Sequence, residues 1–92
     1  MYIWIKHSDV FGYAGISQGQ SEADINNHMD EQEILKFFEG TRVVEMLEKD
    51  CITNLPEGFV EYMESIGWKE EKDMYRVAPY GMVYAYCFSK QE

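Results

Sequence analysis

The side chains with the clearest capacity for chemistry in this chain of 92 residues are carboxylates. The sharpest group follows Pro56, where Glu57, Glu61 and Glu64 are spaced i, i+4 and i+7. On one helix this spacing predicts a line of carboxylates with neighbouring Cβ atoms about 5–6 Å apart. Phosphates along a nucleic-acid strand are separated by distances of the same order. Such a line can therefore present negative charge to a cationic surface.

Three more acidic residues, Glu70, Glu71 and Asp73, extend this line beyond the expected helix. Residues 22–73 hold 15 of the 17 acidic groups and 5 of the 8 basic groups, a net charge of −10, whereas the other 40 residues carry +1. This balance argues against direct nucleic-acid binding, in which Lys and Arg neutralise phosphates, and against anionic membranes. We expect these six residues to contact a basic surface of another protein. The alternative interpretation is a solvated helix face that only maintains solubility.

Other chemistries are poorly supported. His7 and His28 are each followed two residues later by an aspartate, a pattern that can contribute metal ligands but is common by chance, so we expect no metal site. Cys51 follows acidic residues and Cys87 lies in an apolar run, which favours two reduced, buried thiols over a catalytic nucleophile or a disulfide. No phosphate-loop, dinucleotide or nucleophile-elbow motif occurs. We therefore expect neither an enzyme nor a bound cofactor.

Two hairpins are predicted to carry the β structure. β-branched and aromatic residues at 2–7, and a weaker run at 10–17, predict an N-terminal hairpin. Residues 74–77 and 82–88 predict a second hairpin around the turn at 78–81.

Helices are predicted between the hairpins. Asp30 and Glu33 form a capping signal before a helix, and Gly40-Thr41 separates it from the next helix because the apolar groups on either side point in nearly opposite directions. A third helix beginning near Pro56 carries an apolar stripe, and Gly67 follows its end. The residues of that stripe are Phe59, Val60, Met63 and Ile66.

These elements predict one α+β domain spanning residues 1–92. Its four-stranded antiparallel sheet would consist of two terminal hairpins, with two or three helices packed on one face. Both faces of the last strand are apolar, so this strand should be central. Because the helices can cover only one face, we expect the other to present Tyr and Trp side chains to solvent or to a partner.

The functional expectation is a small acidic protein-binding module that inhibits a nucleic-acid-acting protein by occupying its basic surface. By analogy of composition alone, inhibitors of this type are encoded by viruses and mobile elements. The alternative is a structural or oligomeric accessory domain that forms a homodimer through an aromatic sheet face including Tyr84 and Tyr86. A third, less favoured hypothesis is a small-molecule site that uses Gly12–Gly15 and the histidines. With no signal-peptide pattern and no apolar run long enough to cross a bilayer, we expect a cytoplasmic protein.

Overall fold

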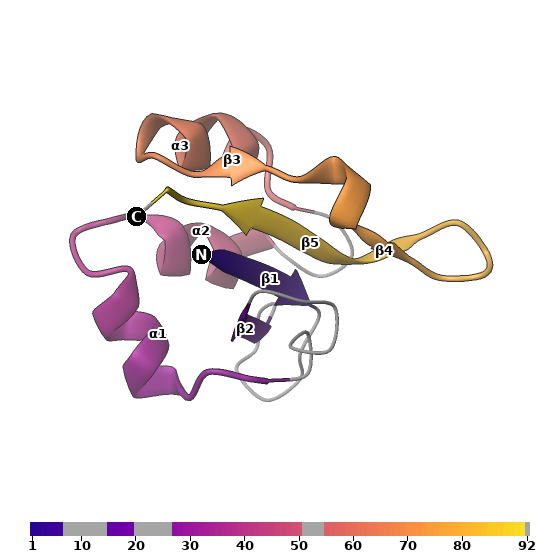
Figure 1. The fold of residues 1–92 in the computed structure, drawn as a ribbon. Helices are drawn as coiled ribbons and strands as arrows, with labels where there is room; N and C mark the ends of the chain where they lie inside the picture. Colours follow the sequence, from indigo (N-terminus) through magenta and orange to yellow (C-terminus); the bar gives the residue numbers. More distant parts are fainter. Residues whose placement is uncertain (7–14, 20–26, 51–54, 92) are drawn as a thin grey trace.

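The computed structural model of the chain describes residues 1–6, 15–19, 27–50 and 55–91. Within them it has an α+β architecture of three α-helices and an antiparallel sheet of five strands (Figure 1). The strands are β1 (Tyr2–Lys6), β2 (Gly15–Gly19), β3 (Lys69–Glu70), β4 (Arg76–Val77) and β5 (Val83–Ser89). The helices are α1 (Glu31–Phe37), α2 (Val43–Asp50) and α3 (Phe59–Ser65), and a 3-10 turn, η2, spans Lys72–Met74.

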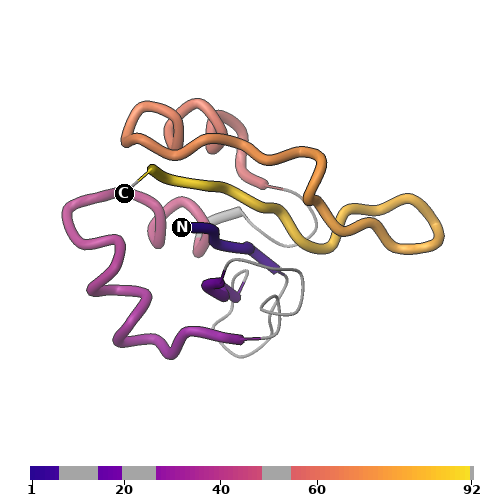
Figure 2. The backbone as a smooth tube through the Cα atoms, in the orientation of Figure 1, coloured from indigo at the N-terminus to yellow at the C-terminus, as the bar shows by residue number. Residues whose placement is uncertain are grey.

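The predicted C-terminal hairpin is present, and β5 is central as expected. Of the second N-terminal strand predicted at 10–17, residues 10–14 lie outside the described residues, and the observed strand β2 begins at Gly15 and continues to Gly19. β1 pairs with β2, with Ile5 opposite Ile16, and β4 pairs with β5, with Val77 opposite Val83. The sheet order is β2-β1-β5-β3, so the first and last strands of the chain are neighbours. Their pairing brings the two ends of the described chain together, as Figure 2 also shows.

The predicted count of four strands is wrong because the edge beside β5 is divided between two short strands. No strand was predicted at residues 69–73, but Lys69 and Glu70 pair with β5, and the Glu71 N–H donates to the Cys87 carbonyl at 2.9 Å. The η2 turn then interrupts the pairing before β4 rejoins the same strand. Backbone groups beside a central strand are stabilised by hydrogen bonding, which explains why even a charged segment pairs there.

One face of the sheet and the three helices share a single apolar cluster. Ile3 and Ile5 alternate with Trp4 along β1, so they point to the opposite side of the sheet from the indole. The cluster also contains Ile16 and Phe88 from β2 and β5. The helices contribute Ile34 and Phe38, Val43 and Leu47, and Phe59 and Met63, in chain order.

Local signals set the start of α1 and the break between α1 and α2 as predicted. The Asp30 carboxylate accepts the Glu33 N–H at 2.8 Å, and the Glu33 carboxylate accepts the Asp30 N–H at 3.2 Å, which completes a capping box. Gly40 has φ +80°, a conformation that costs glycine little, and the chain turns there between α1 and α2. The Thr41 hydroxyl accepts the Val43 N–H at 3.4 Å at the start of α2.

The second face of the sheet differs from the expectation. Trp4 is 0% exposed and belongs to a smaller cluster with Ala85 and Cys87, against which Tyr2, Met74 and Tyr75 pack. The prediction that this face presents its tryptophan to solvent is therefore wrong for Trp4. Bulky side chains from the neighbouring η2 region pack around it, an arrangement that short-range sequence patterns do not reveal.

Candidate functional site

The acidic surface predicted from the sequence lies over α3, β3 and η2. Phe59 and Met63 anchor α3 to the core, and the Tyr62 hydroxyl accepts the Arg42 N–H at 2.8 Å. Glu61 and Glu64 are exposed, as expected from their positions relative to this buried stripe. Their i, i+3 spacing places the two carboxylates near each other on the helix surface.

Glu57 is exposed, but it does not lie on the helix. Helical hydrogen bonding begins with the Tyr62 N–H and the Gly58 carbonyl at 3.0 Å, and α3 starts at Phe59. Gly58 has φ +78°, which turns the chain between Glu57 and the helix and which residues with a Cβ rarely adopt. The predicted line of three carboxylates on one helix is thus reduced to Glu61 and Glu64, preceded by a separate exposed glutamate.

Glu70 and Glu71 are half-buried and bonded within the molecule. The Tyr75 hydroxyl donates to Glu70 Oε2 at 2.5 Å, and the Ser89 hydroxyl donates to Glu71 Oε1 at 2.8 Å. Lys72 Nζ lies 3.9 Å from Glu70, and Lys69 Nζ lies 3.7 Å from Glu71. These two glutamates therefore hold β3 and η2 against β5, and they are less available to a partner than the sequence suggested.

The remaining carboxylates of this surface are Glu57, Glu61, Glu64 and Asp73, all exposed. Residues 57–73 contain six carboxylates and two lysines, a net charge of −4. Both lysines lie beside Glu70 and Glu71. Among the described residues, no ion pair involves any of the four exposed carboxylates. Their charge is thus directed to solvent.

The ionisable groups beneath this surface are poorly suited to catalysis. Burial, with a smaller contribution from Glu71, raises the pKa of the Cys87 thiol to about 12. Burial and the hydrogen bond to Glu70 raise the pKa of Tyr75 well above its ordinary range. A thiol with a raised pKa holds its proton at neutral pH and is a weak nucleophile.

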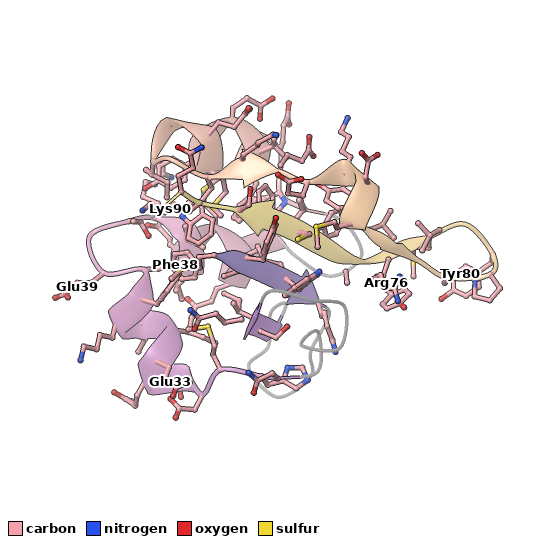
Figure 3. All side chains as sticks on the ribbon, viewed as in Figure 1. Glu33, Phe38, Glu39, Arg76, Tyr80 and Lys90 are labelled. Carbon is pink, nitrogen blue, oxygen red and sulfur yellow. The ribbon has the colours of Figure 1, made fainter. Side chains whose placement is uncertain are left out.

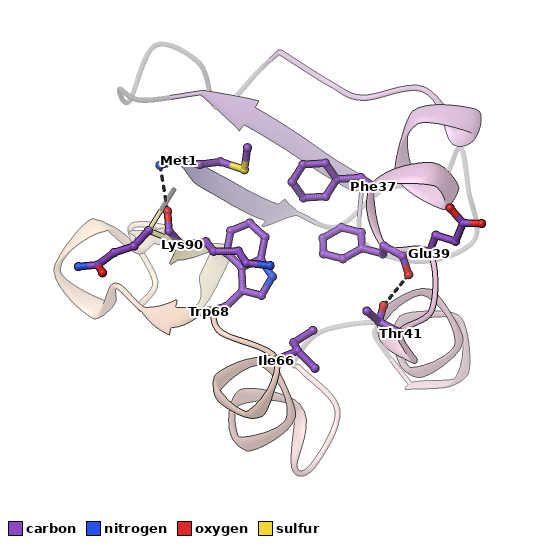
Figure 4. A pocket seen from close by; sticks show the side chains of 9 residues that line it. Met1, Phe37, Glu39, Thr41, Ile66, Trp68 and Lys90 are labelled. Carbon is purple, nitrogen blue, oxygen red and sulfur yellow. Dashed lines mark hydrogen bonds between the residues drawn. The ribbon is translucent and has the colours of Figure 1, made fainter.

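Sequence reasoning missed an aromatic pocket, which Figure 4 shows from close by. It has a volume of about 390 Å³, and the rings of Phe37, Phe38 and Trp68 line it. Met1, Glu39, Thr41, Ile66, Lys90 and Gln91 complete the lining. The sequence did contain one signal for this pocket, the adjacent positions of Phe37 and Phe38. Neighbouring side chains on a helix point about 100° apart, so the two rings cannot both face the centre of one core.

A wider groove continues from this pocket toward the acidic surface. Glu64 and Glu71 line the groove together with Lys69 and Ser89. Four residues line both the groove and the pocket, and these are Met1, Trp68, Lys90 and Gln91. The groove and the aromatic pocket are therefore continuous, and Glu64 and Glu71 are the carboxylates of the acidic surface that border them.

The two tyrosines predicted as a partner face have different environments. Tyr84 is 41% exposed on the β4–β5 hairpin, which extends away from the rest of the fold (Figure 2). Tyr86 is half-buried against the main core, and its ring packs edge-to-face on Tyr75 with centroids 5.0 Å apart. Tyr84 and Tyr86 share one face of β5, and because the main core covers Tyr86 there, the expected aromatic face is incomplete. Tyr80, 76% exposed at the hairpin turn, is the more accessible ring (Figure 3).

The structure describes only some of the other candidate site residues from the sequence. Cys87 is reduced and buried as predicted, and His28 is exposed and bridges to Ser17. His7, Cys51 and the segment Gly12–Tyr13–Ala14 lie outside the described residues. Within the described parts of the chain, no three His, Cys, Asp or Glu side chains cluster as metal ligands would. The helices found there are too short and too polar to cross a bilayer.

Comparisons with protein-family models, with curated proteins and with solved structures find no match for this chain.

Proposed function

We propose that this protein is an acidic binding module that occupies the basic, nucleic-acid-binding surface of another protein and thereby inhibits it. The observation that carries the proposal is the set of exposed carboxylates, Glu57, Glu61, Glu64 and Asp73, which have no cationic partner among the described residues. A face that served only solubility would more often alternate signs, as the sequence of residues 42–49 does, in which Glu45 and Glu48 alternate with Arg42 and Lys49.

Electrostatic complementarity explains how such a surface would inhibit. Negative charge raises the rate of encounter with a positively charged groove and orients the two proteins before contact. While the groove is occupied, phosphates of DNA or RNA cannot enter it. The module need not catalyse a reaction, and we propose no enzymatic activity and no direct nucleic-acid contact.

Charge reversal on α3 tests this proposal. The immobilised protein should capture a partner from a cell lysate at about 50 mM salt and release it at about 500 mM, where screening is strong. Excess duplex DNA should also release the partner, because both ligands need the same surface. Glu61→Lys combined with Glu64→Lys should reduce capture by about tenfold or more, since each change replaces an attraction with a repulsion.

The matched control is Glu31→Lys combined with Glu48→Lys, which makes the same change in net charge at exposed positions on α1 and α2. This variant should retain most of the capture. Equal capture by the parent and both variants, or a captured partner that duplex DNA does not displace, would contradict the proposal.

A second candidate function is self-association through the β4–β5 hairpin. Val77, Tyr80 and Tyr84 are 55%, 76% and 41% exposed, and Arg76 is the only Asp, Glu, Lys or Arg between residues 74 and 89. These exposed apolar side chains favour a contact, whereas the net charge of −9 on each copy opposes it.

Light scattering separates the two functions. If the hairpin forms a homodimer, the parent should have twice the monomer mass, and Tyr80→Ser combined with Tyr84→Ser should return it to the monomer mass. Glu31→Gln is a control for unrelated surface changes and should leave the mass unaltered. A parent that remains monomeric at high concentration in about 500 mM salt, where repulsion is screened, excludes this candidate.

A further inference from the structure

The aromatic pocket already contains a cationic side chain. Lys90 Nζ lies 5.5 Å from the centroid of the Trp68 ring, within the range of a cation–π interaction. Phe37 and Phe38 pack beside the same indole, with centroids 5.9 and 6.2 Å from it. The Lys90 ammonium and the two phenylalanine rings are thus all neighbours of the same indole.

The backbone of Lys90 is fixed, whereas its side chain is exposed. The Lys90 N–H donates to the Met1 carbonyl at 2.9 Å, and the Met1 ammonium donates to the Lys90 carbonyl at 3.2 Å. The side chain has no ion pair among the described residues, and its contact with Trp68 is the interaction that places it. A solvent-exposed cation–π contact is a weak interaction. Another cation can therefore displace Lys90 while the fold stays intact.

Two exposed carboxylates flank the pocket. Glu39 belongs to the pocket lining, and Glu64 lines the groove that continues from Trp68. Glu71 also lines this groove, but it accepts a hydrogen bond from Ser89 and lies 3.7 Å from Lys69 Nζ, so it is less available to a ligand. A ligand of about 390 Å³ could lie on the aromatic rings while its charge faces these carboxylates. A wholly apolar ligand would gain burial against the rings but nothing from the acidic flank.

We propose that the pocket binds a guanidinium or ammonium side chain of the basic partner, which replaces Lys90 on Trp68. This inference rests on the proposed function and specifies the chemistry that the partner inserts. A planar guanidinium can stack on an indole and donate to carboxylates at once, so arginine is the expected residue. The contact would anchor the partner at one end of the acidic surface.

A probe that needs no partner tests the pocket directly. N-acetyl-arginine methylamide should shift the Trp68 indole resonance in a saturable way in a two-dimensional ¹H–¹⁵N NMR spectrum. N-acetyl-norleucine methylamide, at matched ionic strength, should shift it far less. The buried Trp4 indole is an internal reference that neither probe should move, and Trp68→Phe assigns the two signals. If the norleucine probe binds as well as the arginine probe, the pocket recognises apolar groups and the inference is overturned.

Removing the Lys90 ammonium tests the proposal further, because the proposal predicts the direction in which the affinity for the arginine probe changes. Lys90→Met keeps the aliphatic stem and should tighten binding of the arginine probe about two- to fivefold, because the probe no longer competes with Lys90. Lys69→Met removes one positive charge from the same groove but none from the Trp68 ring, so its effect should be smaller. Equal effects of the two variants would mean that Lys90 contributes only general electrostatics and would overturn the inference.

Substitution of Phe37, whose ring is half-buried, tests whether binding of the arginine probe requires the aromatic rings of the pocket. Trp68 is only 4% exposed, so its replacement endangers the core, whereas Phe37→Leu preserves most of the apolar volume. Phe37→Leu should weaken the arginine probe several-fold with a cooperative thermal transition retained, and unchanged binding would overturn the inference. Because these titrations contain no partner, their failure would overturn the pocket assignment alone. The capture experiment on α3 would still decide the proposed function.

Discussion

At the scale of single residues, the same side-chain type performs two roles within a few positions. Glu70 and Glu71 accept hydrogen bonds from Tyr75 and Ser89 and so stabilise the fold. Glu61 and Glu64, by contrast, direct their charge to solvent from α3. The difference arises from neighbours rather than from the carboxylates themselves, because a half-buried carboxylate requires partners and an exposed one does not.

The raised pKa of Cys87 predicts a loss of stability in alkali. Between pH 9 and 12 the folded chain keeps a thiol proton that the unfolded chain releases, so the free energy of unfolding should fall as the pH rises. This contribution is complete below pH 9 and is lost by about pH 12, at up to about 1.4 kcal/mol per pH unit. Urea unfolding at pH 9 and 10, in a Cys51→Ser background, should show this decrease.

Cys87→Ala in the same background is the comparison for that experiment. It should lower stability at every pH through lost packing, but it should have a shallower decrease between pH 9 and 10. A slope identical to that of the Cys87 protein would show that this thiol does not couple folding to pH. Tyr75 acts in the same direction at higher pH, so the window near pH 9 isolates the cysteine.

At the scale of elements, α3 carries its carboxylates at both ends. Glu61 lies in the first turn, where the positive end of the helix dipole favours an anion. Glu64 lies in the last turn, which contains no basic residue and where the dipole disfavours an anion. A glutamate at this disfavoured position is consistent with a role in binding rather than in stability.

The dipole therefore predicts opposite effects for two similar substitutions. Glu64→Lys should raise the free energy of unfolding by about 0.3–1 kcal/mol, and Glu61→Lys should leave it unchanged or lower it. Thermal or urea unfolding of the two variants measures the difference directly. The stabilised Glu64→Lys protein should nonetheless capture less partner, which separates binding from folding. If both substitutions shift the free energy of unfolding equally and in the same direction, the helix dipole does not determine the effect of charge on α3.

At the scale of the whole molecule, charge is segregated from the sheet. The central strands β1 and β5 contain Lys6 but no carboxylate, whereas residues 22–73 hold a net charge of −10. This separation concentrates the negative potential over the helices and the adjoining η2 region, which increases the reach of the field. It also means that the carboxylates repel one another in the folded state.

This repulsion predicts that salt stabilises the isolated protein. Raising NaCl from about 0.05 to 0.5 M should increase the melting temperature, because the Debye length falls from above 10 Å to a few Å. Glu61→Lys combined with Glu64→Lys changes the formal charge from −9 to −5 and should show a smaller increase. Differential scanning calorimetry at low and high salt makes this comparison. A melting temperature that falls with salt, or rises equally for both proteins, would show that repulsion between these carboxylates does not limit the stability of the fold.

The sequence by itself determined features that depend on near neighbours. Alternating residues indicated the paired strands, the Asp30–Glu33 capping box marked the start of α1, and Gly40 marked its end. The concentration of negative charge between residues 22 and 73 is likewise a property of the sequence. These features were predictable because hydrogen bonds within a few residues and the period of a strand or helix decide them.

Only the tertiary structure decided which of these groups remain accessible. It divided the strand beside β5 and buried Trp4. It also provided hydrogen-bond donors for Glu70 and Glu71, namely Tyr75 five residues away and Ser89 eighteen residues away. It also assembled the pocket from Phe37, Phe38, Trp68 and Lys90, which come from separate parts of the chain. The physical reason is that burial and charge pairing depend on strand register and helix docking between residues far apart in sequence, which local patterns do not specify.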